Sequence, residues 1–130
     1  WSSKDYAGFS EVKPWMKVNK NHKEINVFDQ EKNPDSLFNA YKEILQLRKE
    51  EDLAYGDCQF IDLKNEDIFA YETTGKNYDY LIIANFTSQL VEHDIKVDDG
   101  YQPYLTNIAK FNIETKNLKA YETRIYRRKR

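Results

Sequence analysis

At residues 78–86 the chain reads Tyr78-Asp79-Tyr80-Leu81-Ile82-Ile83-Ala84-Asn85-Phe86. The part from Tyr80 to Ala84 is an unbroken run of apolar, strand-forming residues, and residues 74–77 and 87–89 on either side are polar or turn-forming. A run this short favours a strand over a helix, and a strand that is apolar on both faces must be covered on both sides. We therefore expect a central strand, with an antiparallel β domain built around it.

Weaker, alternating patterns before and after this run predict further strands. The predicted strands cover residues 57–63, 67–73, 78–86, 89–96, 101–106, 110–113 and 118–127. Turn signals such as Asp98-Asp99-Gly100 separate them at short and regular spacing. This spacing is typical of an antiparallel sheet or sandwich with meander or Greek-key connections, and it predicts a mainly β fold over residues 53–130.

Residues 1–34 show little periodicity and are predicted to form a long loop. Such a loop is unusual inside a small domain, and it carries more aromatic and aliphatic side chains than it can bury by itself. These side chains are Trp1, Tyr6, Phe9, Trp15, Ile25, Val27 and Phe28. We therefore expect the loop to pack against a larger body.

A helix is predicted over residues 35–51. Asp35 or Ser36 caps its start just after Pro34, and apolar residues recur on one half of its circumference. Arg48 falls in the middle of that apolar half, where an unpaired charge is costly. Either its stem lies on the apolar surface and its head reaches the rim, or it forms an ion pair with a partner domain; we prefer the second interpretation.

Composition excludes several classes of protein. The 130 residues carry a net charge of −2, so the chain has no general attraction for nucleic acid, and residues 127–130, although basic, are interpreted as a solvated strand end. Cys58 is the single cysteine, which rules out a disulfide framework or a thiolate metal site. No apolar run is long enough to predict a transmembrane helix.

The chain begins with Trp1 and its one methionine is Met16, from which we expect a processed or shortened protein.

No self-contained catalytic centre is predicted. His22 and His93 lie far apart and lack ligand spacing, so no metal is expected, and no cofactor motif is found. The sequence Asn85-Phe86-Thr87 matches a glycosylation sequon but falls at a predicted strand end. Carboxylate residues are abundant, but their spacing nominates no general acid and base, so no catalytic residue is assigned.

Several short motifs along the chain occur together in a fixed order. The N-terminal ones are Ala7-Gly8-Phe9-Ser10, Pro14-Trp15-Met16-Lys17-Val18-Asn19 and Glu24-Ile25-Asn26-Val27. Shorter ones follow in the same order: Asn33-Pro34-Asp35-Ser36, Tyr41-Lys42, Leu47-Arg48-Lys49, Tyr55-Gly56-Asp57, Ile82-Ile83-Ala84-Asn85-Phe86 and Ala120-Tyr121-Glu122-Thr123. The proline-tryptophan segment is the most specific of them. Together these motifs resemble the oligo-1,6-glucosidase and α-glucosidase branch of glycoside hydrolase family 13.

The resemblance implies a (β/α)8 barrel followed by a C-terminal antiparallel β domain. It places residues 1–52 at the end of the barrel, as a long loop and the last helix, and residues 53–130 in the C-terminal domain. The catalytic carboxylates of the family would precede Trp1, and the chain's own missing barrel would be its partner. Trp1, Phe9 and Trp15 could line the sugar entrance, or they could only pack the loop onto the barrel.

The motifs and composition are consistent with three functions. The first is an inactive C-terminal part of a cytoplasmic α-glucosidase that cleaves α-1,6 bonds of isomaltose-type α-gluco-oligosaccharides with retention. The second is a non-catalytic sugar-binding β module. The third is the same part of a trehalose-6-phosphate hydrolase or a sucrose isomerase.

Overall fold

The computed structural model describes residues 1–97, 100–108 and 116–130. The chain folds as two compact units, Trp1–Leu45 and Gln46–Arg130, which we call unit 1 and unit 2. The division falls inside helix α2 (Leu37–Glu50), whereas the predicted domain boundary follows residue 52. Among the described residues, no helix has the length and apolar character needed to cross a membrane.

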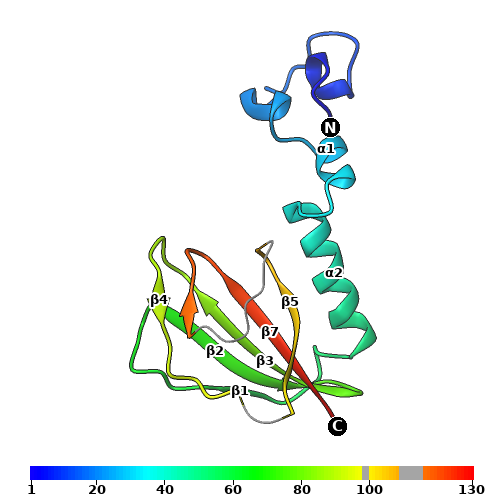
Figure 1. Cartoon of the computed structure of the whole chain (residues 1–130). Helices are drawn as coiled ribbons and strands as arrows, with labels where there is room; N and C mark the ends of the chain where they lie inside the picture. Colours follow the sequence, from blue (N-terminus) through cyan, green and yellow to red (C-terminus); the bar gives the residue numbers. More distant parts are fainter. Residues whose placement is uncertain (98–99, 109–115) are drawn as a thin grey trace. The chain divides into compact units, whose positions relative to one another are not determined.

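Unit 2 is built on a five-stranded antiparallel sheet (Figure 1). Its strands lie in the order β1-β2-β3-β7-β5, so β3 is central, as the apolar run at residues 80–84 predicts. The strand bounds are β1 Cys58–Phe60, β2 Ile68–Thr74, β3 Tyr78–Asn85, β7 Thr123–Lys129 and β5 Gln102–Thr106. The mainly antiparallel β fold expected for this half of the chain is confirmed.

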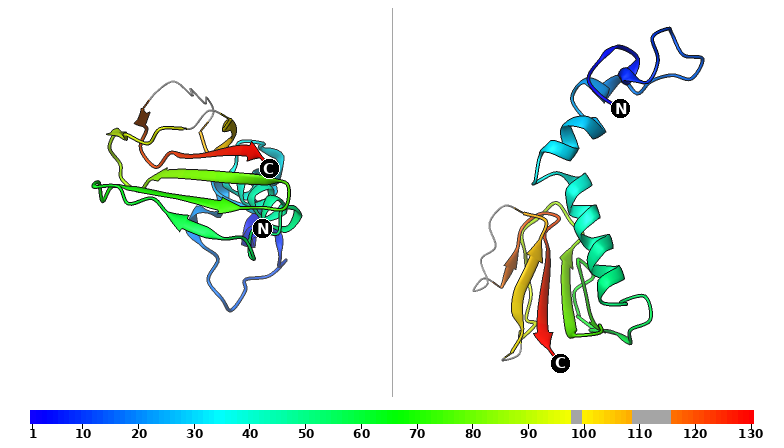
Figure 2. Two further views of the ribbon diagram at one scale, coloured as in Figure 1. Left: turned by 90° about the horizontal axis from the view of Figure 1, so that it is seen from below. Right: turned by 90° about the vertical axis from the view of Figure 1, so that its right-hand side faces the viewer.

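A second sheet of two short strands, β4 (Val91–Glu92) and β6 (Asn117–Leu118), supplies another layer. Val91 and Leu118 join one face of the main sheet in a common hydrophobic core, so the unit is a small sandwich (Figure 2). The core residues are Ile68, Ala70, Leu81, Ile83, Val91, Tyr101, Leu118 and Tyr126. We call this side of the main sheet the sandwich face.

The opposite side of the main sheet, which we call the helix face, is covered in part by the end of α2. Alternate residues of a strand point to opposite faces, so Tyr80 and Ile82 turn away from the sandwich core that holds Leu81 and Ile83. Leu47 of α2 packs there on Tyr80 and Ile125. Both faces of β3 are therefore covered from Tyr80 to Ile83, which explains why this part of its sequence is continuously apolar.

Backbone geometry requires glycine where α2 leads into β1. A Cβ atom on Gly56 would lie 1.9 Å from the Thr74 carbonyl oxygen, a distance that no side chain can tolerate. The neighbouring residue Asp57 is tied to the same strand, since its N–H donates to Thr74 Oγ1 at 2.9 Å. Only glycine allows the chain to approach β2 this closely.

Unit 1 is not the structureless loop that residues 1–34 predict. It contains two 3-10 helices, η1 (Asp5–Gly8) and η2 (Lys20–Lys23), and a short helix α1 (Val27–Lys32). The Asn26 side chain caps α1 by accepting a hydrogen bond from the Asp29 N–H at 3.0 Å. Because α1 has only six residues, it is too short to show a hydrophobic period, and the prediction missed it.

The other element boundaries differ modestly from prediction. Helix α2 covers 37–50 instead of 35–51, and Ser36 is its cap, because Ser36 Oγ accepts from the Asn39 N–H at 3.2 Å. The predicted strand 118–127 is interrupted, because Tyr121 adopts a left-handed conformation (φ 55°) in a turn between β6 and β7. The predicted strands at 57–63 and 89–96 shorten to β1 and β4, and the one at 110–113 lies outside the described residues.

Candidate functional site

Unit 1 has almost no hydrophobic interior. Its buried residues are Ala7, Asn26 and Ser36, two of which are polar. Its large exposed apolar residues are Trp1, Tyr6, Phe9, Val12, Trp15, Met16, Ile25, Val27, Phe28, Leu37, Phe38, Tyr41, Ile44 and Leu45. A soluble unit rarely exposes so many large apolar side chains, so they indicate an interaction surface.

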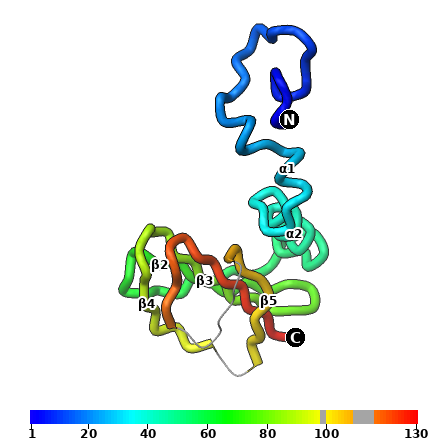
Figure 3. Tube along the Cα trace, turned by 45° about the horizontal axis from the view of Figure 1, so that its top comes forward, coloured from blue at the N-terminus to red at the C-terminus, as the bar shows by residue number. Residues whose placement is uncertain are grey.

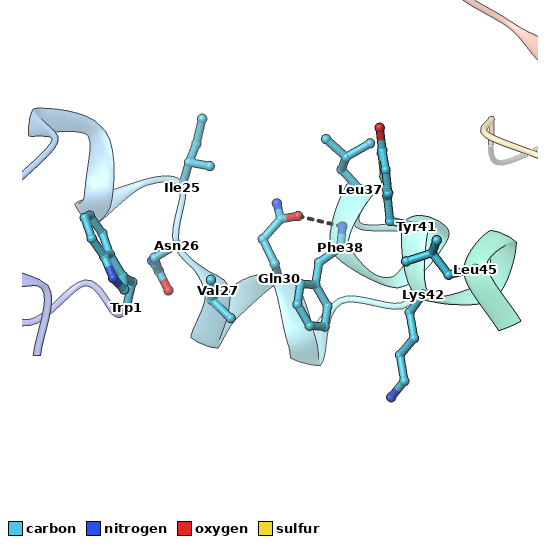
Figure 4. A pocket seen from close by; sticks show the side chains of 10 residues that line it. All are labelled: Trp1, Ile25, Asn26, Val27, Gln30, Leu37, Phe38, Tyr41, Lys42 and Leu45. Atoms are coloured by element: carbon cyan, nitrogen blue, oxygen red, sulfur yellow. Dashed lines mark hydrogen bonds between the residues drawn. The ribbon is translucent and has the colours of Figure 1, made fainter. Parts of the chain in front are cut away.

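Part of this surface forms a groove of about 660 Å³ (Figure 4). Its lining comes from the chain start, from α1 with the residues before it, and from the first turns of α2. The lining residues are Trp1, Ile25, Asn26, Val27, Gln30, Leu37, Phe38, Tyr41, Lys42 and Leu45. Most of them are aliphatic or aromatic, so the groove suits an apolar partner surface better than a polar ligand.

Polar contacts, not apolar packing, hold the two helices of the groove together. Ser36 Oγ donates to the Gln30 carbonyl at 2.6 Å, and Gln30 Oε1 accepts from the Phe38 N–H at 3.2 Å. Asn39 Nδ2 donates to the carbonyls of Gln30 at 3.0 Å and Asn33 at 2.8 Å. This network satisfies the end of α1 and the start of α2, and it leaves the apolar side chains of both helices available for a partner.

The chain start is tied to the same groove. The Phe28 N–H donates to the Trp1 carbonyl at 3.0 Å, which places Trp1 beside the beginning of α1 (Figure 3). Asn26 supports this junction, since its Nδ2 donates to Asp29 Oδ2 at 2.7 Å and to the His22 carbonyl at 3.0 Å. Trp1 is therefore positioned by backbone contacts that no sequence motif reveals.

The three residues predicted to line a sugar entrance are not gathered at one place. Trp1 and Phe9 stack, with ring centroids 5.6 Å apart and planes inclined by 25°. Trp15 is outside this pair and is 93% exposed. The Trp1–Phe9 stack covers one side of each ring, so only the remaining sides could contact a sugar or a protein partner.

Unit 2 contains a polar hollow of about 220 Å³ at one end of the sandwich face, which the sequence did not reveal. Tyr101 Oη donates to Glu72 Oε1 at 3.2 Å, and Arg128 Nη2 donates to Asp79 Oδ2 at 3.2 Å. Burial, followed by the nearby Glu72 carboxylate, raises the pKa of Tyr101 to about 12. The Glu72 and Asp79 carboxylates are thus engaged with a phenol and a guanidinium, an arrangement that supports the ends of the strands.

A buried ion pair lies deeper in the sandwich face. Arg124 Nε donates to Glu122 Oε1 at 2.6 Å, and both side chains are almost completely buried. Arg124 also donates to the Asn117 carbonyl at 2.6 Å, so it links β7 to β6. Glu122 Oε2 accepts from the Lys119 N–H at 2.7 Å, which closes the turn before β7. These contacts assign the pair a structural role.

His93 is buried near this pair, and its ring nitrogens have no hydrogen-bond partner among the described residues. Burial, followed by the positive charge of Arg124, lowers the pKa of the His93 imidazole. A neutral imidazole is therefore the stable form in the folded unit. Within the described residues, no group of three or more His, Cys, Asp and Glu side chains could hold a metal ion.

Two sequence features acquire structural explanations. The Asn85 side chain of the sequon is buried, and its Nδ2 donates to the carbonyls of Gln89 at 2.7 Å and Lys119 at 2.8 Å. That amide nitrogen is therefore occupied inside the unit.

In the basic C-terminal cluster, Arg127 lies 4.1 Å from the ring centroid of Tyr104, and Arg130 Nη1 donates to the Gly75 carbonyl at 3.0 Å. Arg127 and Arg130 of this strand end therefore make contacts within unit 2.

Comparison with known proteins agrees with the resemblance seen in the motifs. A protein-family model described as the α-amylase catalytic domain matches residues 1–56. An α-glucosidase of Candida albicans is 42% identical over 97% of this chain and 22% of its own length. An oligo-1,6-glucosidase of Bacillus cereus is 34% identical over 99% of this chain and 24% of its own length. The chain thus spans about a quarter of the length of these curated relatives.

Solved structures share the fold along the whole chain. Trehalose-6-phosphate hydrolase of Bacillus licheniformis superposes with a TM-score of 0.81 at 32% identity, over 100% of this chain and 25% of that one. Isomaltulose synthase of Klebsiella sp. LX3 superposes with a TM-score of 0.85 at 27% identity, over 98% of this chain and 24% of that one. Sequence motifs, family model and fold agree, and they identify the chain as an α-glucosidase-like part of glycoside hydrolase family 13, the α-amylase family.

Proposed function

We propose that the chain is the C-terminal part of an α-glucosidase that hydrolyses α-1,6-glucosidic bonds of isomaltose-type oligosaccharides with retention of configuration. In this proposal the chain supplies no catalytic residue and stabilises the catalytic barrel. The observation that carries the proposal is the apolar surface of unit 1, which falls within the residues matched by the α-amylase catalytic domain. A segment without a core of its own requires a body to pack against.

The proposal assigns residues 1–52 to the end of the barrel and residues 53–130 to the C-terminal domain. The part of the groove lined by Phe38, Tyr41 and Leu45 would be filled by apolar side chains of the barrel. Trp1, Phe9 and Trp15 are proposed substrate-binding residues, on loops at the barrel mouth, where enzymes of this architecture place their active sites. A cytoplasmic location is part of the same proposal.

Retaining hydrolysis sets the chemistry expected of the longer protein. One carboxylate attacks the anomeric carbon and a second carboxyl group protonates the leaving oxygen, with the two groups about 5–5.5 Å apart. The oligo-1,6-glucosidase of Bacillus cereus and the α-glucosidase of Candida albicans support this class of reaction by their similarity. Both carboxyl groups would precede Trp1.

A different reaction within the same family is the second candidate. Trehalose-6-phosphate hydrolase and isomaltulose synthase both resemble this chain in structure, with TM-scores of 0.81 and 0.85. The longer protein could therefore act on trehalose 6-phosphate or isomerise sucrose. A sugar-binding module is the candidate from outside catalysis, and the exposed aromatic side chains of unit 1 are its support.

The test begins with the mass of the native protein, detected in its source with an antibody against this chain. We expect a band about four times the size of the chain, because the curated relatives are longer by about that factor. The purified longer protein should release glucose from isomaltose, with the α-anomer formed first in a proton NMR time course. The isolated chain should release none.

Three outcomes would redirect the proposal. Turnover of trehalose 6-phosphate or sucrose in preference to isomaltose would establish the second candidate. A native protein no larger than this chain would refute the glucosidase proposal. In that case, saturable binding of isomaltose by the isolated chain in calorimetry would establish the binding module.

A further inference from the structure

A row of polar side chains crosses the main sheet at one end of the sandwich face and lines the polar hollow of about 220 Å³. The strand register places Thr74 of β2 opposite Asp79 of β3, and Asp79 opposite Arg128 of β7. Asp57 extends this row, because its carbonyl oxygen accepts from the Thr74 N–H at 3.0 Å. Asp79 lies two residues before the core residue Leu81, so the row is on the sandwich face.

A second row and one aromatic side chain complete the hollow. Gln59 of β1 pairs with Glu72 of β2, and Tyr101 Oη donates to Glu72 Oε1 at 3.2 Å. The Arg128 guanidinium lies 4.6 Å from the Tyr101 ring centroid and donates to Asp79 Oδ2 at 3.2 Å. These contacts hold Glu72, Tyr101 and Arg128 in fixed positions, and such preorganisation lowers the cost of binding a ligand.

Several hydrogen-bonding groups of the lining are open to a ligand. Asp57 and Gln59 are exposed, and within the described part of the chain neither side chain makes a hydrogen bond or ion pair. Glu72 accepts through Oε1, which leaves Oε2 open among the same residues. Arg128 uses Nη2 for Asp79, and its guanidinium carries further N–H donors. The hollow therefore presents acceptors and donors side by side.

This mixture of donors and acceptors indicates the class of ligand. Among the described residues, no group of three or more His, Cys, Asp and Glu side chains could hold a metal ion. A hydroxyl group both donates and accepts, so adjacent hydroxyl groups on one ring can satisfy a carboxylate and a guanidinium together. The volume of 220 Å³ equals that of about seven water molecules, which is room for one small ring.

We propose that the hollow binds one neutral sugar ring, or another small polyol with adjacent hydroxyl groups. Asp57 and Glu72 Oε2 accept hydrogen bonds from the ligand hydroxyl groups, and Gln59 and Arg128 donate to its oxygen atoms. Every residue of the site belongs to unit 2, so the inference does not rest on the proposed function. D-Glucose is a suitable probe, because it is neutral and carries adjacent hydroxyl groups on a single ring.

Titration of the isotope-labelled 130-residue chain with D-glucose, followed by two-dimensional NMR of its amides, tests the site. We expect saturable shifts of the amides that line the hollow, with a Kd on the order of 1–10 mM, because a small ligand in an open polar site gains little affinity. The amides of residues 1–36 should not shift. The absence of saturable shifts up to about 100 mM glucose would overturn the inference.

Two substitutions test the assigned contacts. Asp57→Asn keeps the shape and removes the charge, so it should raise the Kd at least about fivefold, and Gln59→Ala should raise it about threefold. Asp62→Asn is the matched control, because Asp62 is also exposed in unit 2 but does not line the hollow, and its Kd should stay within about twofold. An unchanged Kd in both Asp57→Asn and Gln59→Ala would overturn the inference.

Rival ligands show which chemistry the hollow recognises. Cyclohexanol has a ring of similar size with one hydroxyl group, and it should bind at least about tenfold more weakly than glucose. Calcium chloride and ethylammonium chloride test the carboxylates as a cation site, and neither should displace glucose at about 0.15 M sodium chloride. Equal binding of cyclohexanol, or displacement of glucose by either cation at lower concentration, would overturn the inference.

The outcomes separate this inference from the proposed function. Glucose binding at the hollow supports the inference whether or not the longer protein hydrolyses isomaltose. An active longer glucosidase, together with a 130-residue chain whose hollow shows no shifts, refutes the inference and leaves the function intact. Shifts confined to residues 1–36 would place sugar binding on unit 1 and refute the hollow as the site.

Discussion

Removal of the Glu122 carboxylate gives the sharpest test of how unit 2 is held together. Glu122→Ala takes away the acceptor of two hydrogen bonds, one from Arg124 Nε at 2.6 Å and one from the Lys119 N–H at 2.7 Å. Both charged side chains are buried, with 3% and 1% of their area exposed, so water cannot replace the lost carboxylate. Breaking a buried pair from one side typically costs about 3–5 kcal/mol of unfolding free energy.

A graded series isolates the charge from the hydrogen bonds. Glu122→Gln keeps the size and an acceptor for the Lys119 N–H, so we expect it to cost less than Glu122→Ala by about 1–2 kcal/mol. Arg124→Met together with Glu122→Gln removes both charges, and it should be less harmful than Glu122→Ala. The double substitution is the matched control, because it leaves no charge without a partner.

The assay must report on unit 2. Trp1 and Trp15, the two tryptophans, both lie in unit 1, so their fluorescence does not follow the sheet. Urea unfolding followed by far-ultraviolet circular dichroism is the suitable measurement, with a slope of about 1 kcal/mol per molar urea for a unit of this size. Glu122→Ala should then shift the midpoint down by about 3 M or unfold the unit outright. A cost below about 1 kcal/mol would refute the reasoning.

Three further predictions concern other parts of the chain. The pKa of His93 is lowered in the folded chain, so the unfolded chain binds a proton at this imidazole more readily. The contribution of His93 to the unfolding free energy is therefore complete above pH about 6.5 and is lost as the pH falls further. His93→Gln should reduce this loss in acid unfolding curves, and an unchanged curve would contradict the assignment. Asn85→Asp should lower the unfolding free energy of unit 2 by about 2 kcal/mol in urea unfolding. The reason is that a carboxylate would face the two carbonyl oxygens that accept hydrogen bonds from Asn85 Nδ2. A cost below about 0.5 kcal/mol would show that these hydrogen bonds are unimportant. In the isolated chain, amides of unit 1 should exchange hydrogen at least about 100-fold faster than those of β3, and equal protection would show that unit 1 needs no partner.

Much of unit 2 follows from short-range patterns. The apolar run from Tyr80 to Ala84 predicts a central strand, since a strand without a polar side can exist only where both of its faces are covered. The helix from residue 37 follows from the Ser36 cap and from apolar spacing. Local signals of this kind depend on a few neighbouring residues, and tertiary packing did not override them here.

The elements that were missed have physical reasons. Helix α1 is held by the Asn26 cap and by contacts with α2, and it is too short to show a hydrophobic period. The interruption between β6 and β7 depends on the left-handed Tyr121, a conformation that a tyrosine rarely adopts and that its sequence does not announce. Surrounding contacts stabilise it: the Tyr121 N–H donates to the Thr87 carbonyl at 3.0 Å, and Glu122 closes the turn.

The sequence predicts that unit 1 exposes apolar side chains, but it does not predict the contacts that shape the groove. Residues 1–34 hold more aromatic groups than a loop can bury, and this excess correctly predicts an exposed apolar surface. The groove itself joins Trp1 to α1 and α2 through the Phe28–Trp1 hydrogen bond and the Ser36–Gln30 contact. Neither contact follows from residue types, because many other pairs of polar groups in this segment could have formed instead.

Local patterns predict strand β3, helix α2 and the family resemblance, because apolar periodicity, caps and motifs are properties of neighbouring residues. Which side chains share a surface depends on how the strands pair and how the helices pack. Alternation divides the side chains of β2 into two sets, but only the register with β3 shows that Phe69 and Tyr71 belong to the side that carries Leu47. A one-residue slip would exchange the two faces, so the side of the sheet that carries Phe69 and Tyr71 is defined only once the strands are paired.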